Sequence, residues 1–115
     1  MKAQHLRKPS EFARLYDLKI RAGDKHLLIF AGSSESGVTR FGLSVSKRHG
    51  NAVRRARLKR LLREAFRTKQ HELPAGLDMI LIPRANSGAS LDDYQRSLVE
   101  LASRLSRRLA KQEQS

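Results

Sequence analysis

The chain has 115 residues, of which 24 are Lys or Arg and 11 are Asp or Glu, so its formal net charge is +13. A chain of this length forms one domain with one core, and this excess of positive charge implies a polyanionic partner, most commonly nucleic acid. The lack of cysteine excludes disulfides and thiol chemistry. No apolar run approaches the ~20 residues that a membrane-spanning helix needs, and residues 1–10 lack the apolar segment of a signal peptide. We therefore expect a cytoplasmic protein with no membrane partner, folded as a single domain over residues 1–115.

The first part of the chain predicts one short helix followed by three strands. Ser10 is the expected N-cap of the helix, because an acid and apolar residues follow it at helical spacing, and Pro9 prevents an upstream extension. Two strands are expected around a turn, at residues 19–22 and 26–31. Residues 40–46 alternate between apolar and polar side chains, which predicts a strand with one buried face.

A basic helix is the most distinctive part of the sequence. Residues 47–69 read KRHGNAVRRARLKRLLREAFRTK and hold ten of the 24 Lys and Arg residues with a single acid. Gly50 and Asn51 provide a turn and an N-cap, so we expect a helix over residues 51–68. At 100° per residue, one side of this helix is apolar and the opposite side is cationic.

The cationic side of this helix carries the functional prediction. A charged helix face is often merely solvated, but such faces usually alternate Glu with Lys. Here cations recur at spacings of three and four, which makes like charges neighbours, at Arg57, Arg60, Arg63 and Arg67. An external polyanion would relieve this repulsion, so we interpret the helix as a nucleic-acid-binding surface.

The remainder of the chain predicts one buried strand and one long helix. Residues 79–82 form a short apolar run, as expected for a central strand. Ser90 begins a final helix with acids in its first turn and an apolar stripe that reaches Leu109. The order helix, three strands, helix, strand, helix is typical of an α+β sandwich with helices packed on one sheet. We expect residues 1–8 and 111–115 to be flexible.

Residues 41–67, FGLSVSKRHGNAVRRARLKRLLREAFR, closely resemble the signature of the bacterial ribonuclease P protein subunit. The remaining sequence agrees in length and order, so the resemblance covers essentially the whole chain. It implies a four-stranded sheet with helices packed on it, as in the second domain of ribosomal protein S5. It also implies a left-handed β-α-β crossover, which departs from the usual right-handed rule.

The resemblance also implies a function. The family's protein binds a large catalytic RNA and the 5′ leader of precursor tRNA, and the holoenzyme is an endoribonuclease that removes the leader. The RNA performs the hydrolysis with Mg²⁺, which is held mainly by RNA phosphates. We therefore expect no catalytic and no metal-binding residues in the protein, and a monomer when the protein is alone.

The resemblance locates the expected contacts. The family's Arg-Asn-Arg element falls on Arg55, Ala56 and Arg57, so the central Asn is absent. With the helix pattern, this predicts an RNA-binding set of Lys47, Arg48, Arg54, Arg55, Arg57, Lys59, Arg60, Arg63 and Arg67. His49 is expected to extend this surface. The family's leader cleft uses the first helix and the second strand, which places it on Phe12, Tyr16, Leu27 and Ile29.

The helical wheel suggests a division of labour among the cations. Arg55, Lys59 and Arg63 lie on the flank nearer the apolar side, and we expect them to follow the single-stranded leader. The cations that point further from the sheet would grip the folded RNA, namely Arg57, Arg60 and Arg67.

Several alternatives remain open. Phe12 and Tyr16 have an equal claim to be ordinary core residues, and Lys47 with its neighbours could form a solvated turn. A ribosomal or general RNA-chaperone protein would share the charge, and a stand-alone nuclease would cut RNA without a catalytic RNA. The nuclease is disfavoured because the four histidines lie scattered in the sequence, without the spacing of metal ligands.

Overall fold

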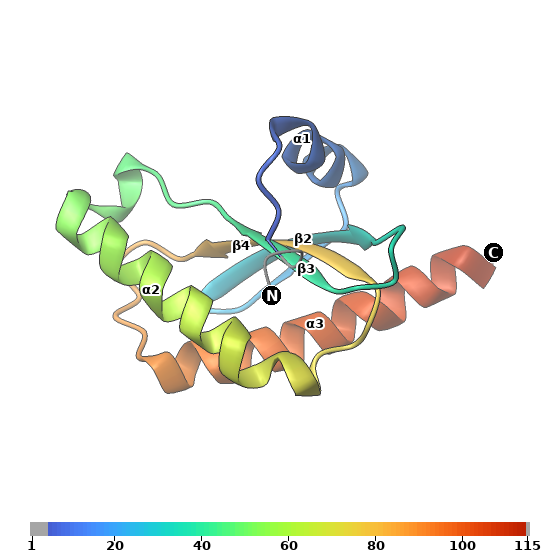
Figure 1. Cartoon of the computed structure of the whole chain (residues 1–115). Helices are drawn as coiled ribbons and strands as arrows, with labels where there is room; N and C mark the ends of the chain where they lie inside the picture. The colour runs from blue at the N-terminus through green and yellow to red at the C-terminus, as the bar shows by residue number, and fades with distance from the viewer. Residues whose placement is uncertain (1–4, 115) are drawn as a thin grey trace.

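The computed structural model describes residues 5–114 (Figure 1). Its elements in chain order are α1 (Pro9–Leu18), β1 (Arg21–Gly23), β2 (Leu27–Ser33), β3 (Arg40–Leu43), the 3-10 turn η2 (Lys47–His49), α2 (Ala52–Lys69), the 3-10 turn η3 (Gln70–Glu72), β4 (Leu77–Pro83) and α3 (Leu91–Gln114). The predicted order of helices and strands, and with it the α+β class, is confirmed. Within the described range, no helix is long and apolar enough to cross a membrane.

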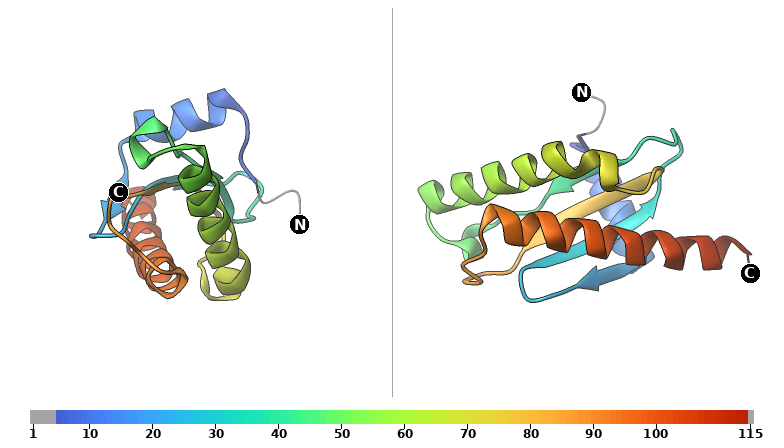
Figure 2. Two further views of the ribbon diagram at one scale, coloured as in Figure 1. Left: turned by 90° about the vertical axis from the view of Figure 1, so that its left-hand side faces the viewer. Right: turned by 90° about the horizontal axis from the view of Figure 1, so that it is seen from below.

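The four strands form one mixed sheet in the order β1-β2-β4-β3. β2 pairs antiparallel with both β1 and β4, whereas β3 pairs parallel with β4, to which α2 connects it. Helices α2 and α3 cover one face of the sheet, and α1 lies on the other (Figure 1). In the right-hand view of Figure 2, α2 lies in front of the sheet, both parallel strands run from right to left, and β4 lies below β3. This arrangement makes the β3-α2-β4 crossover left-handed.

The main core lies between the sheet and the pair α2 and α3. Alternate residues of β2 point into it, because successive side chains of a strand face opposite ways. Leu27 and Ile29 are fully buried there. From the helices come Leu62, Ala65, Phe66, Tyr94, Leu98, Leu101, Ala102, Leu105 and Leu109.

A second, smaller core lies between α1 and the opposite face of the sheet. Leu6, Leu15 and Ile80 are buried in it, and Phe12 and Phe30 pack against them. The expectation that residues 40–46 form a strand with only one buried face is therefore wrong, since β3 ends at Leu43 and both of its faces are covered.

Gly42 shows how closely α1 approaches β3. A Cβ atom at this position would lie 2.5 Å from the ring carbon Cζ of Phe12, so only glycine leaves room for that ring. The alternation of residues 40–46 places Gly42 on the polar face of the expected strand, whereas in the structure its lack of a side chain leaves room for the ring of Phe12.

The start of helix α1 differs from expectation, and the flexibility expected for residues 5–8 and 111–114 stays a prediction. Helix α1 begins at Pro9, with Lys8 rather than Ser10 at the N-cap, because proline suits the first helical position, where no N–H donor is required. Residues 5–8 are held by the sheet, since buried Leu6 donates its N–H to the Phe41 carbonyl at 2.8 Å. Residues 111–114 continue α3. The flexibility expected for residues 1–4 and 115 lies outside the described range.

A network of buried charge joins α1 to the sheet. The Asp78 carboxylate on β4 is fully buried and accepts two hydrogen bonds from Arg40 on β3, both of 2.8 Å, and one of 2.5 Å from Arg14 on α1. Glu11 on α1 also pairs with Arg40, at 3.0 Å. The hydrogen bonds to Asp78 raise the pKa of Arg40 above its ordinary value, so this guanidinium stays charged and holds α1 in place.

Candidate nucleic-acid interface

The basic helix α2 forms as the sequence predicts. Asn51 caps it, its side-chain oxygen accepting the N–H of Arg54 at 2.9 Å, which satisfies one of the free donors of the first turn. The apolar side of α2 is anchored in the main core, where Phe66 stacks on Phe41 of β3 with ring centroids 4.1 Å apart. Because the helix is fixed through this side, its cationic side is held outward.

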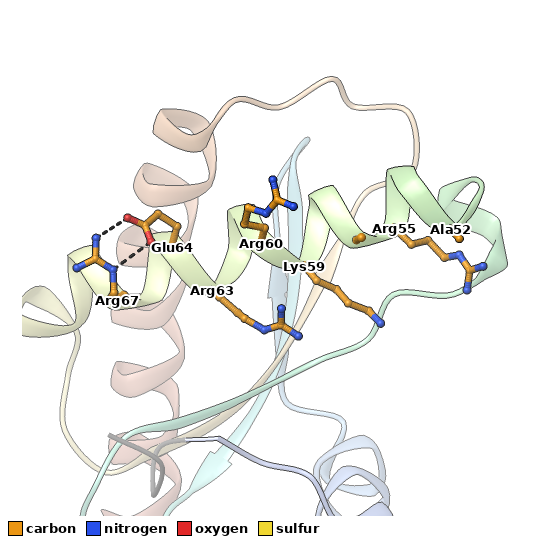
Figure 3. Close-up of a pocket in the computed structure, with 8 residues that line it drawn as sticks. Ala52, Arg55, Lys59, Arg60, Arg63, Glu64 and Arg67 are labelled. Carbon is orange, nitrogen blue, oxygen red and sulfur yellow. Dashed lines mark hydrogen bonds and ion pairs between the residues drawn. The ribbon is translucent and has the colours of Figure 1, made fainter.

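An open hollow of about 500 Å³ runs along the exposed side of α2 (Figure 3). Its lining consists of Ala52, Arg55, Ala56, Lys59, Arg60, Arg63, Glu64 and Arg67. Figure 3 shows Arg55, Lys59 and Arg63 extending to one side of the helix and Arg60 to the other. The arrangement on which the expected division of labour depends is therefore present for these four cations.

Most of these cations have no carboxylate partner. Among the described residues, Arg67 is the exception within this hollow, since its guanidinium makes two hydrogen bonds to Glu64 and holds the pKa of that carboxyl below its usual value. Arg55 in addition buries an Nε donor that finds no hydrogen-bond partner in the described structure. A bound phosphate would neutralise these unpaired cations, and one of its oxygens would accept a hydrogen bond from the unsatisfied donor.

A second hollow, of about 270 Å³, connects α2 with the N-terminal segment and α1. We term it the α1–α2 cleft, and it is lined by His5, Leu6, Arg7, Phe12, Leu43, Lys59 and Arg63. Lys59 and Arg63 belong to both hollows, so the cationic side of α2 continues without interruption into a cleft that contains an aromatic ring.

His5 is the titratable group of this cleft. Its ring stacks on Phe41 with centroids 4.6 Å apart. Burial lowers the pKa of His5, and the positive charges of Arg7 and Arg63 lower it further. Burial and the two nearby guanidinium groups thus both disfavour the charged imidazole.

The leader cleft expected from the resemblance needs one correction. Leu27 and Ile29 cannot line it, because both point into the main core and have no exposed surface. The aromatic residue that β2 contributes to the α1 side is Phe30. Its ring meets Tyr16 edge to face, with centroids 4.9 Å apart, and Tyr16 is 36% exposed.

The orientation of Phe30 toward α1 could have been predicted from the sequence. The strand alternates, and three of its residues on one face are buried in the main core, namely Leu27, Ile29 and Ala31. The intervening positions must then face α1, and Phe30 is the aromatic one among them. An error of one residue in strand phase exchanges the two faces, which is why the prediction selected the wrong pair.

The loop before α2 is held by His49, which is buried rather than part of the cationic surface. Its Nδ1 accepts the Ser46 N–H at 3.0 Å, so Nε2 carries the proton and donates it to the Pro83 carbonyl at 2.7 Å. Lys47 and Arg48 remain exposed. The sequence could not show that the histidine ties this loop to the end of β4.

Two further cations extend this surface, Arg84 near the start of α2 and Arg7 in the α1–α2 cleft. Arg54 and Arg57 line a third hollow, of about 160 Å³, together with Arg84 at the end of β4. Arg84 and Arg7 were not predicted, because each lies outside the basic segment in sequence. Among the side chains that the structure describes, those of residues 5–112, no group of three or more His, Asp or Glu could hold a metal ion.

Comparison with known proteins agrees with this geometry. A family model described as Ribonuclease P matches residues 1–106. The ribonuclease P protein component of Serratia proteamaculans is 38% identical over 105 residues, which cover 90% of this chain and 85% of the relative. The corresponding protein of Lachnoclostridium phytofermentans is 32% identical over 101 residues and 87% of each chain.

Solved structures show the same fold. The ribonuclease P protein of Thermotoga maritima superposes with a TM-score of 0.78 at 26% identity, covering 87% of this chain and 96% of that one. A mutant of the Staphylococcus aureus protein, described as defective in mRNA degradation, gives a TM-score of 0.80 at 27% identity and covers 91% of this chain and 90% of its own.

Proposed function

The chain belongs to the ribonuclease P protein family, and from this membership we propose that it is the RNA-binding subunit that helps a catalytic RNA to remove the 5′ leader of precursor tRNA. The observation that carries the proposal is the continuity of the cationic side of α2 with the α1–α2 cleft, through Lys59 and Arg63. A single strand of RNA binds to a cationic surface through its phosphates and to apolar or aromatic side chains through its bases, and this continuous surface offers both.

We assign the leader to the α1–α2 cleft. Lys59 and Arg63 would neutralise its phosphates while Phe12 contacts a base, and Arg55 would contribute from the next turn of α2. Backbone contacts fix the position of an RNA without reading its sequence. Such contacts suit a protein that must accept many precursor tRNAs with different leaders.

We assign the catalytic RNA to the other flank of α2. Arg57 and Arg60 are exposed there and have no carboxylate partner among the described residues. Between the two retained arginines of the family element, Ala56 offers no hydrogen bond, whereas asparagine has an amide that both donates and accepts. Affinity on this flank then rests on the charge and the N–H donors of the arginines.

The chemistry is assigned to the RNA and its Mg²⁺. Among the described residues, the Asp78 carboxylate is already engaged by Arg40 and Arg14, and the Glu64 carboxylate by Arg67. Neither is free to hold a cation, so the ion would rest on RNA phosphates, which are hard oxygen ligands that Mg²⁺ prefers. The role of the protein is to bind, orient and neutralise.

Reconstitution tests this function. Precursor tRNA is incubated at low Mg²⁺ with the catalytic RNA alone, with the protein alone and with both. Cleavage at the leader junction that requires the RNA and is stimulated by the protein supports the proposal. Cleavage by the protein alone would instead identify a nuclease, and RNA binding without any effect on cleavage would identify a ribosomal or general chaperone protein.

A matched pair of variants sharpens this test. Lys59→Gln with Arg63→Gln should reduce the stimulation by the protein. Lys25→Gln with Arg96→Gln removes the same charge from the exposed turn between β1 and β2 and from the first half of α3, and it should leave the stimulation unchanged. Equal loss in both would show that overall charge, rather than the cleft, is responsible.

A further inference from the structure

The C-terminal half of α3 carries a second group of cations, away from α2. The group consists of Arg104, Arg107, Arg108 and Lys111, and all four are exposed. Their spacing of three, four and seven places them on one side of the helix. The first half of α3 differs, because its exposed arginine, Arg96, is paired with both Asp92 and Asp93.

The pairing in this second half is incomplete. Arg104 has Glu100 as a partner at 2.6 Å, and Arg108 donates to the backbone carbonyl of Arg21 on β1. Among the described side chains, Arg107 and Lys111 have no carboxylate partner. The helix dipole favours cations only within the last turn, so it accounts for Lys111 but not for the three arginines that precede it.

These cations are continuous with the aromatic pair on the α1 side of the sheet. Arg21 lies opposite Phe30 in the register of β1 and β2, and its guanidinium is 5.8 Å from the centre of that ring. Phe30 in turn contacts Tyr16. Because β1 lies alongside the C-terminal half of α3 (Figure 2), a cationic path leads from Tyr16 and Phe30 around the edge of the sheet to Arg108.

We propose that β1 and the C-terminal half of α3 form a second RNA-binding strip, which takes the leader nucleotides farther from the cleavage site than those in the α1–α2 cleft. This proposal rests on the proposed function, because it needs a leader in that cleft. The strip consists of Arg21, Arg104, Arg107, Arg108 and Lys111.

RNA fits this strip better than an anionic membrane does. A helix that lies in a membrane surface presents an apolar side to the lipid, but the apolar side of α3 is buried against the sheet, with Leu101, Leu105 and Leu109 in the main core. A row of cations beside exposed Tyr16 and partly buried Phe30 is instead the kind of arrangement that binds single-stranded nucleic acid.

The test compares leaders of stepwise increasing length, bound as precursor tRNA to the reconstituted holoenzyme. The variant is Arg107→Gln with Lys111→Gln, which removes the two unpaired cations without touching a buried contact. The wild type should gain affinity as the leader lengthens, and the variant should lose this gain while binding the shortest leader normally.

Salt dependence gives the expected size. Each lost phosphate contact on a single strand lowers the slope of log affinity against log salt by about 0.7, so two contacts make the wild type lose about sevenfold more affinity than the variant between about 50 and 200 mM salt. The control is Arg96→Gln with Lys25→Gln, which removes the same charge elsewhere and should preserve the gain with length.

Three outcomes would overturn the strip. In the first, the affinity of the variant increases with leader length as much as that of the wild type. In the second, the variant loses as much affinity for the shortest leader as for the longest. In the third, the increase with leader length is unchanged but the variant no longer binds anionic vesicles, which would identify a membrane surface. Failure of the proposed function looks different, because the wild-type protein would then fail to stimulate cleavage with any leader.

Discussion

Replacement of Asp78 by Asn tests how α1 is held over the sheet. The substitution preserves the shape of a fully buried side chain and removes its negative charge. Three hydrogen bonds end on this carboxylate, two from Arg40 and one from Arg14. The variant therefore leaves two guanidinium groups beside a neutral amide.

The expected loss of stability follows from burial. Breaking a buried ion pair by removing one partner costs about 3–5 kcal/mol. The side chains of Arg14 and Arg40 are 42% and 26% exposed, so water can partly solvate both after the change, and we expect the lower end, about 3 kcal/mol. Urea unfolding followed by far-ultraviolet circular dichroism should show a midpoint lower by about 1.5 M, for a slope near 2 kcal/mol/M.

Glu64→Gln is the matched control. It also removes a carboxylate that makes two hydrogen bonds to an arginine, but the Glu64 and Arg67 side chains are 41% and 66% exposed. We expect a much smaller loss of stability, because water already solvates both groups and screens their attraction. If Asp78→Asn lost no more than this control, the argument that burial makes the network strong would be refuted. Because the network holds α1, Asp78→Asn under folding conditions should also weaken leader binding more than binding of the catalytic RNA.

Three other variants test the cleft and the helix. Gly42→Ala places a methyl group against Phe12 and should lower the free energy of unfolding by about 1–3 kcal/mol. It should also weaken binding of a leader oligonucleotide, and unchanged binding would contradict the role of Phe12 in the α1–α2 cleft. Arg60→Glu should weaken binding of the catalytic RNA and spare the isolated leader, and the reverse result would contradict the division between the two flanks of α2. A phosphate bound beside His5 should raise the lowered pKa of this imidazole, which couples leader binding to the uptake of a proton by His5. Leader affinity should therefore increase as the pH falls toward the ordinary histidine value of about 6.5 in the wild type but not in His5→Gln.

The sequence predicted the elements whose signals are local. The N-cap Asn51 and the apolar side of α2 depend on residues within a few positions of one another, and both are found in the structure. The same holds for the apolar stripe of α3. Periodicity reports which residues share a face of one helix or strand, so it succeeds wherever a single element decides the outcome.

Features that depend on packing between distant segments were not predictable in this way. Gly42 accepts the ring of Phe12 from α1, and His49 binds the carbonyl of Pro83. Neither partner lies close in sequence. The phase of β2 is a related case, because Leu27 and Phe30 are both apolar and only the sheet's two covered faces distinguish them.

Arginine has two roles in this fold, and a neighbouring carboxylate decides between them. Arg14 and Arg40 count toward the net charge of +13, yet buried Asp78 neutralises part of their charge and makes them structural. Arg63 has no such partner among the described residues, so its charge remains available to a phosphate. The number of cations therefore implies a polyanion, but only the positions of the few acids show where that polyanion binds.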